Sequence, residues 1–408
     1  MSKELAFVLI NPHTIAKSRT GGVIARYIGR TDLRLVGARM FGPGSELVEK
    51  HSQLVRGSDA GDQSARELIA DYVLAEYAPD KATGKRRRVM LLLFEGEDAI
   101  AKIWKVTGAA TLSMGSGETI RDTYGDYILD ENNNVRYFEP AVLVAQTKKM
   151  AAATLQLWSR YSESDGGIIH SAIDVKGGPK NERTLVLLKP DNFRRQSARP
   201  GNIIDLLSIS GLRIVGAKKF CMTVDQAERF YGPVKAALQK KFGSIGSKRA
   251  ADALSQEFGF PVPEDAVEAL CERLAPIFAE TQFESIVKFM TGFFPSECAD
   301  SEKKRAGKED CLALAYEGED AVEKIRGILG ETDPSKARPG SVRREFGSDI
   351  MVNAAHASDS LENARREMEI IDIEEEAVSG WVNRHYGGPI AKAKEIKKSL
   401  PRSRGGNA

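Results

Sequence analysis

An internal duplication constrains this chain more than any other feature of its sequence. The segment LRLVGARMF at 33–41 recurs as LRIVGAKKF at 212–220, and EGEDAI at 95–100 recurs as EGEDAV at 317–322. A third pair, FVLINP at 7–12 and LVLLKP at 185–190, stands ahead of both. Because all three blocks recur in the same order, we infer two copies of one domain. The 408 residues are also too many for one ordinary core.

The second copy is longer than the first. The offset between matching blocks grows from 179 residues at 33–41 to 222 residues at 95–100, so the second copy holds about forty extra residues. Helical spacing and capping residues at 247–254 and 264–270 predict a helical insertion at about 240–280. We expect a first domain at 1–160, a Ser-, Gly- and Asp-rich linker at 161–180, a second domain at 181–380 and a basic tail at 381–408.

Each copy is expected to run through the same order of elements. Apolar strands are predicted at 6–10, 33–41 and 89–94, and again at 184–188, 212–220 and 311–316. Helices are predicted at 22–27 and 201–207, and a further helix begins at each EGED block. This order predicts the α+β class, with two ferredoxin-like (split βαβ) domains whose antiparallel four-stranded sheets carry packed helices.

Composition and charge exclude several classes of protein. Hydrophobic residues make up 42% and charged residues 28%, the profile of a soluble globular chain without an apolar run of membrane-spanning length or a signal-peptide pattern. The spacing of the four cysteines matches no zinc module, which favours free thiols in the cytoplasm. The net charge is only +2, whereas a protein that binds nucleic acid usually has a broad basic face. We expect neither a nucleic-acid nor a membrane partner.

His356 is the main candidate for chemistry. It lies in VNAAHASDS at 352–360 and is one of five histidines. A histidine among small residues is, taken alone, more often structural than catalytic. Its surroundings change that balance, because a glycine-containing loop that ends in a cation, RPGSVR at 338–343, precedes it. Further upstream stand Arg326, GETDP at 330–334 and KPD at 189–191, where the first strand of the copy ends.

These blocks, in this order, closely resemble the nucleoside diphosphate kinase family over 182 to about 373, apart from the insertion. In that family a histidine takes the γ-phosphate of a nucleoside triphosphate and passes it to a nucleoside diphosphate. The resemblance implies that His356 is the nucleophile, that Glu367 orients its ring and that Ser358 hydrogen-bonds this glutamate. Such chemistry requires one ring nitrogen with a lone pair while the other donates its proton to an acceptor.

The resemblance also assigns the groups that hold the nucleotide. Phosphoryl transfer needs fixed positive charge and hydrogen-bond donors around the migrating group. The side chains that match the family's phosphate, sugar and γ-phosphate ligands are Lys189, Arg326, Arg343, Thr332, Asn353 and Tyr231. Mg²⁺ is expected with the nucleotide, bridging phosphate oxygens rather than sitting in a protein site.

Two departures from the family pattern lie near this site. Alanine follows the nucleophile, at Ala357, where the family has glycine, and this costs little unless the backbone needs a positive φ. The aromatic residue that stacks on the base is harder to place, because the matching position is Gln282. We assign the adjacent Phe283 to nucleotide binding, although it is equally suited to a core and Phe278 is an alternative. Ile350 is a candidate for the opposite apolar wall.

The first copy lacks most of this set. Asn11, Trp104 and Ala110 stand where the second copy has Lys189, Arg326 and Thr332, and Arg121 alone keeps the place of Arg343. No histidine occurs between His51 and His170, and His13 is in the wrong block to replace the nucleophile. We therefore expect a catalytically silent copy. Its role is either structural, as the built-in partner of a pseudo-dimer, or that of a regulatory nucleotide site.

The sequence thus predicts a nucleoside diphosphate kinase that works by a ping-pong mechanism through phospho-His356. Its expected partners are nucleoside di- and triphosphates, and it is expected to form a homo-oligomer or an intramolecular pseudo-dimer. The alternative is a catalytically weak nucleotide-binding or scaffold protein of the same fold, in which the insertion or Ala357 blocks turnover. Transfer from His356 to a protein histidine is a third, minor hypothesis.

Overall fold

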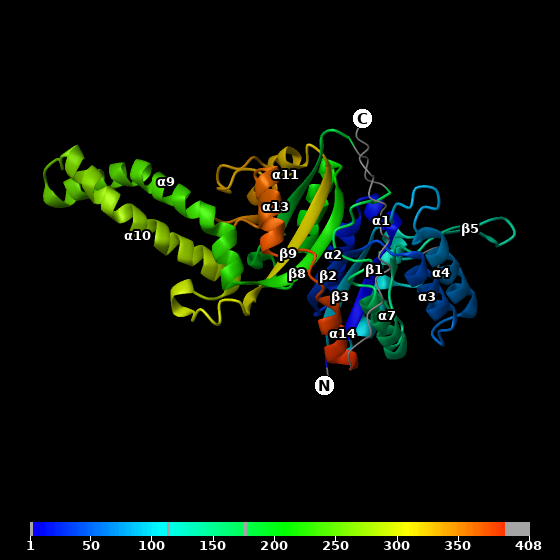
Figure 1. The fold of residues 1–408 in the computed structure, drawn as a ribbon. Coiled ribbons are helices and arrows are strands. Elements are labelled where there is room, and N and C mark those ends of the chain that lie inside the picture. Colours follow the sequence, from blue (N-terminus) through cyan, green and yellow to red (C-terminus); the bar gives the residue numbers. More distant parts are fainter. Residues whose placement is uncertain (1–2, 112–114, 174–177, 388–408) are drawn as a thin grey trace, which may run out of the picture.

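One antiparallel eight-stranded sheet runs through the molecule, in the order β10-β7-β9-β8-β2-β3-β1-β6 (Figure 1). The computed structural model describes residues 3–111, 115–173 and 178–387. The strands of this sheet are β1 (Glu4–Ile10), β2 (Arg34–Phe41), β3 (Val89–Gly96), β6 (Val142–Leu143), β7 (Asn181–Leu188), β8 (Arg213–Thr223), β9 (Ala306–Glu319) and β10 (Ala355–Ala357). Its central strands are apolar runs buried on both faces, as helices on each side require. A separate hairpin consists of β4 (Asp126–Leu129) and β5 (Val135–Glu139).

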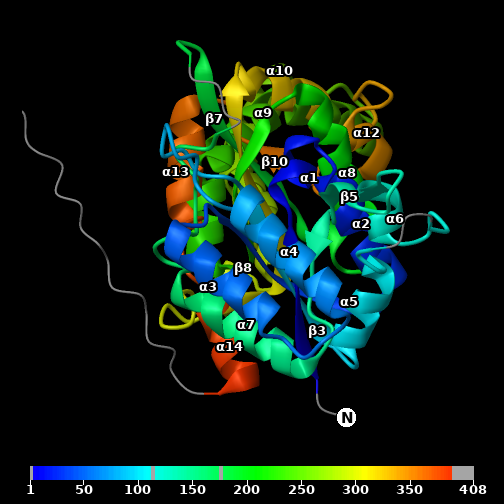
Figure 2. The same cartoon turned by 90° about the vertical axis from the view of Figure 1, so that its right-hand side faces the viewer.

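Helices pack on this sheet in both halves. Those of the first half are α1 (Pro12–Ala16), α2 (Thr20–Arg30), α3 (Ser45–Arg56), α4 (Gln63–Glu76), α5 (Ala99–Thr107), α6 (Ile120–Tyr124) and α7 (Lys148–Arg160). Those of the second half are α8 (Arg199–Leu207), α9 (Val224–Phe258), α10 (Glu264–Thr291), α11 (Ala321–Leu329), α12 (Val342–Phe346), α13 (Leu361–Ile370) and α14 (Val378–Tyr386). Figure 2 shows α3, α4 and α7 gathered on the first half. The predicted α+β class with helices on antiparallel strands is confirmed, and the four strands of each half join those of the other half in one eight-stranded sheet.

The two halves share their topology and their unusual backbone torsions. Strands β6-β1-β3-β2 of the first half repeat the order of β10-β7-β9-β8 in the second. Asp98 and Asp320 have φ values of 51° and 52°, and Ala141 and Ala354 have 61° and 70°. Residues other than glycine rarely adopt such left-handed conformations, so their recurrence at matching points supports one domain built twice.

The halves join edge to edge, which the sequence did not predict. Arg39 on β2 pairs with Lys218 on β8, and these two residues occupy matching positions of the repeated segment. Helices α2 and α8 also meet at the junction, and a glycine on each helix allows their backbones to approach closely. A Cβ on Gly21 would lie 2.4 Å from the Asp205 nitrogen, and one on Gly201 would lie 2.3 Å from the Ala25 nitrogen. Each element meets its own counterpart, as at the isologous interface of a two-fold dimer.

The end of the second half returns across this junction. Helix α14 packs on α7, β1 and β2 of the first half (Figure 1). The Tyr386 hydroxyl donates to the Leu5 carbonyl at 2.6 Å, and His385 Nε2 lies 3.0 Å from a Glu95 carboxylate oxygen. The segment assigned to a basic tail at 381–408 therefore begins within a folded helix, and 388–408 lie outside the described residues.

A long helical hairpin, α9 and α10, projects from the second half (Figure 1). A capping box between Thr223 and Gln226 begins α9, and glycines with positive φ, Gly259 and Gly292, end the two helices. The predicted insertion at about 240–280 falls in the outer part of this hairpin. None of the described helices combines the length and apolar character that a membrane span requires, and all four cysteines are free.

Candidate active site

A cleft of about 1970 Å³ opens between the α9–α10 hairpin and the segment at 330–353. Ligand pockets usually measure about 300–1,000 Å³, so this one has room for a nucleotide and more. Of the residues proposed from the sequence, those that line it are Lys189, Tyr231, Arg326, Thr332, Arg343, Asn353 and His356. Glu367 and Ser358 are buried behind His356. The fold thus brings residues from distant blocks of the sequence to one place.

The short strand β10 positions His356. It pairs with β7, so that His356 lies opposite Leu187, and the Ala354 turn before it accepts the Lys189 backbone N–H at 2.9 Å. His356 Nε2 lies 2.9 Å from a carboxylate oxygen of Glu367, and the Ser358 hydroxyl donates to the same oxygen at 2.7 Å. An ionised carboxylate only accepts, so Nε2 carries the proton and Nδ1 keeps its lone pair.

Two aromatic rings of α9 meet the edge of the His356 ring. The ring centroids of Phe230 and Tyr231 lie 5.0 and 6.2 Å from that of His356. The Tyr231 hydroxyl is buried at the cleft, and the described residues offer it no hydrogen-bond partner. Burial raises the pKa of Tyr231 well above its usual value, so the hydroxyl remains a donor without an acceptor. The contact from Phe230 was not predicted, although its position next to Tyr231 in the sequence is a signal for it.

Lys189 is a nearly buried cation beneath the cleft, with 8% of its surface exposed. Its ammonium donates to the Met351 carbonyl at 2.7 Å and to Asn353 Oδ1 at 2.9 Å. The pKa of Lys189 is lowered to about 8, mainly by burial and also by the neighbouring Arg343, against the opposing effect of Asp191. An anion bound here would relieve that electrostatic cost.

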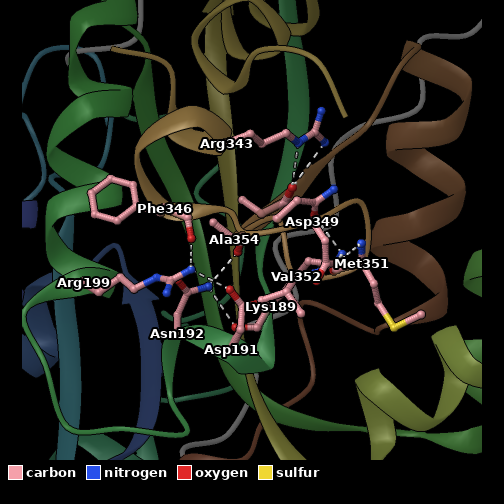
Figure 3. A network of polar contacts seen from close by, with 12 residues as sticks. Lys189, Asp191, Asn192, Arg199, Arg343, Phe346, Asp349, Met351, Val352 and Ala354 are labelled. Carbon is pink, nitrogen blue, oxygen red and sulfur yellow. Dashed lines mark hydrogen bonds and ion pairs between the residues drawn. The ribbon is translucent and has the colours of Figure 1, made fainter. Parts of the chain in front are cut away.

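A second network braces the loop that carries Lys189 (Figure 3). Asn192 donates its amide to the Ala354 carbonyl at 2.6 Å and to the Lys189 carbonyl at 2.9 Å. Arg199 on α8 donates to Asn192 at 2.8 Å and to Asp191 at 2.7 Å. These bonds tie β7 to the turn before His356. Sequence reasoning missed Asn192 and Arg199, because nothing in their local pattern marks them.

The remaining cations and hydrogen-bond donors of the cleft differ in how many hydrogen bonds they already make within the protein. Arg343 donates to the Gly330 and Ala355 carbonyls at 2.8 and 3.2 Å, and burial lowers its pKa to about 10. Asn353 is buried, and its amide donates to the Thr332 and Ile350 carbonyls. Arg326 and Thr332 are exposed along the cleft, and within the described residues the Arg326 guanidinium has no hydrogen-bond or ion-pair partner.

Phe283, which the sequence analysis assigns to nucleotide binding, lies away from the cleft wall. Phe283 is 7% exposed, belongs to the hydrophobic core and is absent from the cleft wall. The wall of α10 instead carries Phe278, Gln282 and Ile286, which share one face at helical spacing. Phe278 stacks on Phe242 of α9, with ring centroids 4.6 Å apart and planes at 28°. Phe283 lies one position past that face and turns inward.

Ala357 causes no backbone strain. It lies within β10 and is not among the positive-φ residues of the described chain, whereas Ala354 three positions earlier has a φ of 70°. The left-handed residue in this turn is therefore an alanine that precedes the nucleophile, and the position after it tolerates a side chain.

Carboxylates near the cleft are dispersed. The described residues contain no group of three or more His, Cys, Asp or Glu side chains able to hold a metal ion. Asp333, Asp349 and Asp359 line the cleft singly, and a hydrogen bond from Asn363 holds the pKa of Asp359 below its usual value. A divalent cation fits this set only if a polyphosphate supplies most of its oxygen ligands.

The corresponding place in the first half is filled. Leu143 on β6 pairs with Leu9, as His356 pairs with Leu187, so a leucine stands where the second half has the histidine. Asn11 donates to the buried carboxylate of Glu139 and accepts from the Tyr77 hydroxyl. The cavity next to Arg121 measures about 40 Å³ and has Trp104 in its wall. This volume is too small for a nucleotide, so this cavity does not provide the regulatory nucleotide site of the alternative hypothesis.

One ferredoxin-like half thus gathers cations, a histidine held by a carboxylate, and a buried hydroxyl without a hydrogen-bond partner among the described residues, an arrangement suited to a ligand of negative charge. A family model for nucleoside diphosphate kinase matches residues 182–244 and 282–377 and leaves out the outer part of the hairpin. The nucleoside diphosphate kinase of Acidiphilium cryptum is 32% identical over 187 residues, which cover 46% of this chain and 90% of that protein. The chain belongs to the nucleoside diphosphate kinase family.

Two further comparisons cover the same region. The nucleoside diphosphate kinase of Methylorubrum extorquens is 30% identical over 46% of this chain and 91% of that protein. A solved NDP kinase from Pyrobaculum aerophilum is 26% identical over 47% of this chain and 94% of that one, with a TM-score of 0.33.

Proposed function

We propose that the protein transfers the γ-phosphate of a nucleoside triphosphate to a nucleoside diphosphate through phospho-His356. The observation that carries the proposal is the bond from His356 Nε2 to Glu367, 2.9 Å long, which leaves Nδ1 as the nucleophilic nitrogen beside a cleft of cations. Family membership and the buried carboxylate support the same assignment.

The reaction has two matched steps. In the first, Nδ1 of His356 forms a bond to the γ-phosphorus while the bond from that phosphorus to the β–γ bridging oxygen breaks, and the nucleoside diphosphate leaves. In the second, the terminal phosphate oxygen of another nucleoside diphosphate attacks the phosphohistidine and restores the free imidazole. Glu367 accepts the hydrogen bond from Nε2–H throughout and stabilises the charge that develops on the ring, while the Ser358 hydroxyl, which donates to the same carboxylate, holds it in place.

The surrounding side chains supply charge and hydrogen-bond donors. Lys189, Arg326 and Arg343 offset the negative charge of the polyphosphate, and Arg326 is free to reach it. The unpaired Tyr231 hydroxyl donates to the γ-phosphate, and Thr332 and Asn353 bound the phosphate and sugar region. A Mg²⁺ ion bound to the phosphates would add positive charge there, and Asp359, which lines the cleft, is the carboxylate proposed to face it.

Phe278 rather than Phe283 is proposed as the platform for the base. It lines the cleft with Phe242, and Ile350 lines the cleft as well. The first half, at 1–160, is proposed as a silent duplicate that serves as the partner in an intramolecular pseudo-dimer, since the junction pairs like elements of the two halves. Further assembly of such chains into oligomers and a cytoplasmic location, which four free thiols favour, complete the proposal.

Initial-rate kinetics test this proposal against binding without turnover. With ATP and a second nucleoside diphosphate varied together, a ping-pong enzyme gives parallel double-reciprocal lines, and His356→Gln abolishes the rate while it still binds ADP. Intersecting lines would contradict the phosphohistidine route. ADP binding without any measurable rate in the wild type would instead favour the nucleotide-binding or scaffold alternative.

A further inference from the structure

We propose that the silent first half holds the His356–Glu367 pair in its reactive geometry, and that Arg39 is the positioning residue through which it acts. The inference rests on the proposed function of His356. Residues 371–377, the C-terminal strap, join α13 to α14 and pass over the junction between the halves.

Arg39 belongs to the first half but is bonded to the strap of the second. Its side chain rises from β2, and the residue is 4% exposed. One guanidinium nitrogen donates to the Glu375 carbonyl at 2.6 Å and another to the Glu374 carbonyl at 3.0 Å. The third nitrogen, Nε, donates to the Ser162 carbonyl at 3.1 Å. Each of the three guanidinium nitrogens of this buried cation thus donates to a backbone carbonyl, and two of these carbonyls lie in the strap.

Lys218, which faces Arg39 across the junction, is bonded to the same strap. Its ammonium donates to the Ile371 and Asp372 carbonyls, both at 2.8 Å, and to the Glu375 carboxylate at 2.5 Å. Two buried like charges on paired positions repel, and each is costly to bury without partners. Displacement of the strap would leave both cations without most of their acceptors. The strap is therefore fixed to the junction from both sides.

The strap is the direct continuation of the helix that carries Glu367. The Ile371 N–H donates to the Glu367 carbonyl at 3.2 Å, and the Ile373 N–H donates to the Met368 carbonyl at 3.2 Å. The last carbonyls of a helix have no partner within it and carry partial negative charge, which nearby cations stabilise. Glu367 thus lies one turn before an end that cations of both halves hold. A small shift of that end would change the contact between Glu367 and His356 Nε2.

This arrangement gives the first half a role in the reaction that needs no nucleotide of its own. A misplacement of about 1 Å at a reacting group lowers the rate about 100-fold. The rate therefore depends on how rigidly Glu367 is held. Another arginine of the first half, Arg34, offers a matched comparison. It forms an ion pair with Asp310 of β9, 3.0 Å long, across the same junction but away from the strap.

The test compares Arg39→Met, Arg39→Lys and Arg34→Met in the full chain, by kcat and KM and by hydrogen exchange of 361–377. We expect Arg39→Met to lower kcat by about 10-fold, with nucleotide KM changed less than about twofold, and to speed exchange in 361–377. Arg39→Lys, the residue type found at 218, recovers most of the rate. Arg34→Met keeps the wild-type kcat and the wild-type exchange in 361–377.

Three results would overturn the inference. One is a folded Arg39→Met protein with unchanged kcat and exchange, and another is an equal loss in Arg34→Met, which would indicate general loosening of the junction. The third is no recovery of the rate in a folded Arg39→Lys protein. If the wild type forms no phosphohistidine, the proposed function fails instead. The exchange data still decide then whether Arg39, and not Arg34, anchors α13.

Discussion

At the scale of single residues, the cleft holds cations and donors whose partners are incomplete. The Tyr231 hydroxyl is buried without an acceptor, and the Lys189 ammonium is buried with two neutral acceptors and no ion pair among the described residues. Both arrangements cost free energy in the empty protein. A phosphate group supplies what each of them lacks, so the site is built for a ligand rather than for stability.

The depressed pKa of Lys189 predicts a pH limit on nucleotide binding. Its pKa falls from 10.5 to about 8, so the ammonium loses its proton in the free protein as pH rises through about 8. ADP affinity should then weaken above about pH 8, by at most about tenfold per pH unit, and binding should take up a proton. Calorimetry in buffers of different ionisation enthalpy measures this uptake. In Lys189→Met, binding should be weaker at every pH, without a break near 8.

The lowered pKa of Lys189 affects the free energy of unfolding in the opposite direction, because this free energy rises with pH where the affinity for ADP falls. Between about pH 8 and 10.5 the unfolded chain binds the lysine proton and the folded chain does not, so this group's cost to folding is relieved as pH rises. A wild-type protein whose affinity for ADP stays constant from pH 7 to 9.5, with no proton uptake, would contradict a buried Lys189 with this pKa.

Residues that separate sequence motifs single out lie close together in the fold. His356, Lys189, Arg343 and Asn353 were proposed from separate blocks of sequence, and the fold gathers them at one cleft. The supports around them were not predicted. Arg199 acts through Asn192, and these two residues follow no pattern in the chain because their contact depends on how α8 packs beside β7.

At the level of helices and strands, the hairpin of α9 and α10 forms one wall of the cleft. Its two helices carry an aromatic pair, Phe242 and Phe278, at the wall opposite the segment at 330–353. Sequence spacing predicted that this region is helical but not which helix face turns to the cleft. Phe283 was assigned to the site for that reason, and a rotation of about 100° per residue directs it into the core instead.

Substitution of Phe278 should therefore affect nucleotide binding, and substitution of Phe283 should affect stability. Phe278→Ala should weaken ADP binding by about 1–3 kcal/mol, as loss of one base–aromatic stack does, while binding of inorganic tripolyphosphate stays the same. Phe283→Ala should instead lower the free energy of unfolding by about 3–5 kcal/mol through a core cavity. Isothermal titration and chemical denaturation measure the two effects. Equal loss of ADP and tripolyphosphate binding in Phe278→Ala would argue against a base platform.

At the level of the whole molecule, like elements of the two halves face one another across the junction. Repeated blocks of sequence predicted two similar domains, and the structure has the same strand order and the same left-handed residues in both. That β2 and β8 would pair could not be predicted, since edge pairing leaves no local pattern. The glycines at 21 and 201 are the closest sequence signal, because they permit α2 and α8 to touch.

The helix crossing predicts a strong effect from one methyl group. A Cβ at position 201 would come within 2.3–2.6 Å of the α2 backbone, so Gly201→Ala must push the halves apart and should destabilise the protein by about 1–3 kcal/mol. Gly380→Ala in α14 has open space around its Cβ and should be neutral or stabilising by up to about 1 kcal/mol. Thermal unfolding of both variants measures the difference. Equal melting temperatures would refute a close crossing of α2 and α8.

In the proposed reaction, one histidine in one half of the chain carries the phosphoryl group. The most direct measurement incubates the full chain with γ-labelled ATP and Mg²⁺, removes free nucleotide and then adds GDP. We predict acid-labile, base-stable label on the protein that moves to GTP on the chase, and no label on His356→Gln. Label that persists in His356→Gln, or that never leaves the wild-type protein for GDP, would contradict the account.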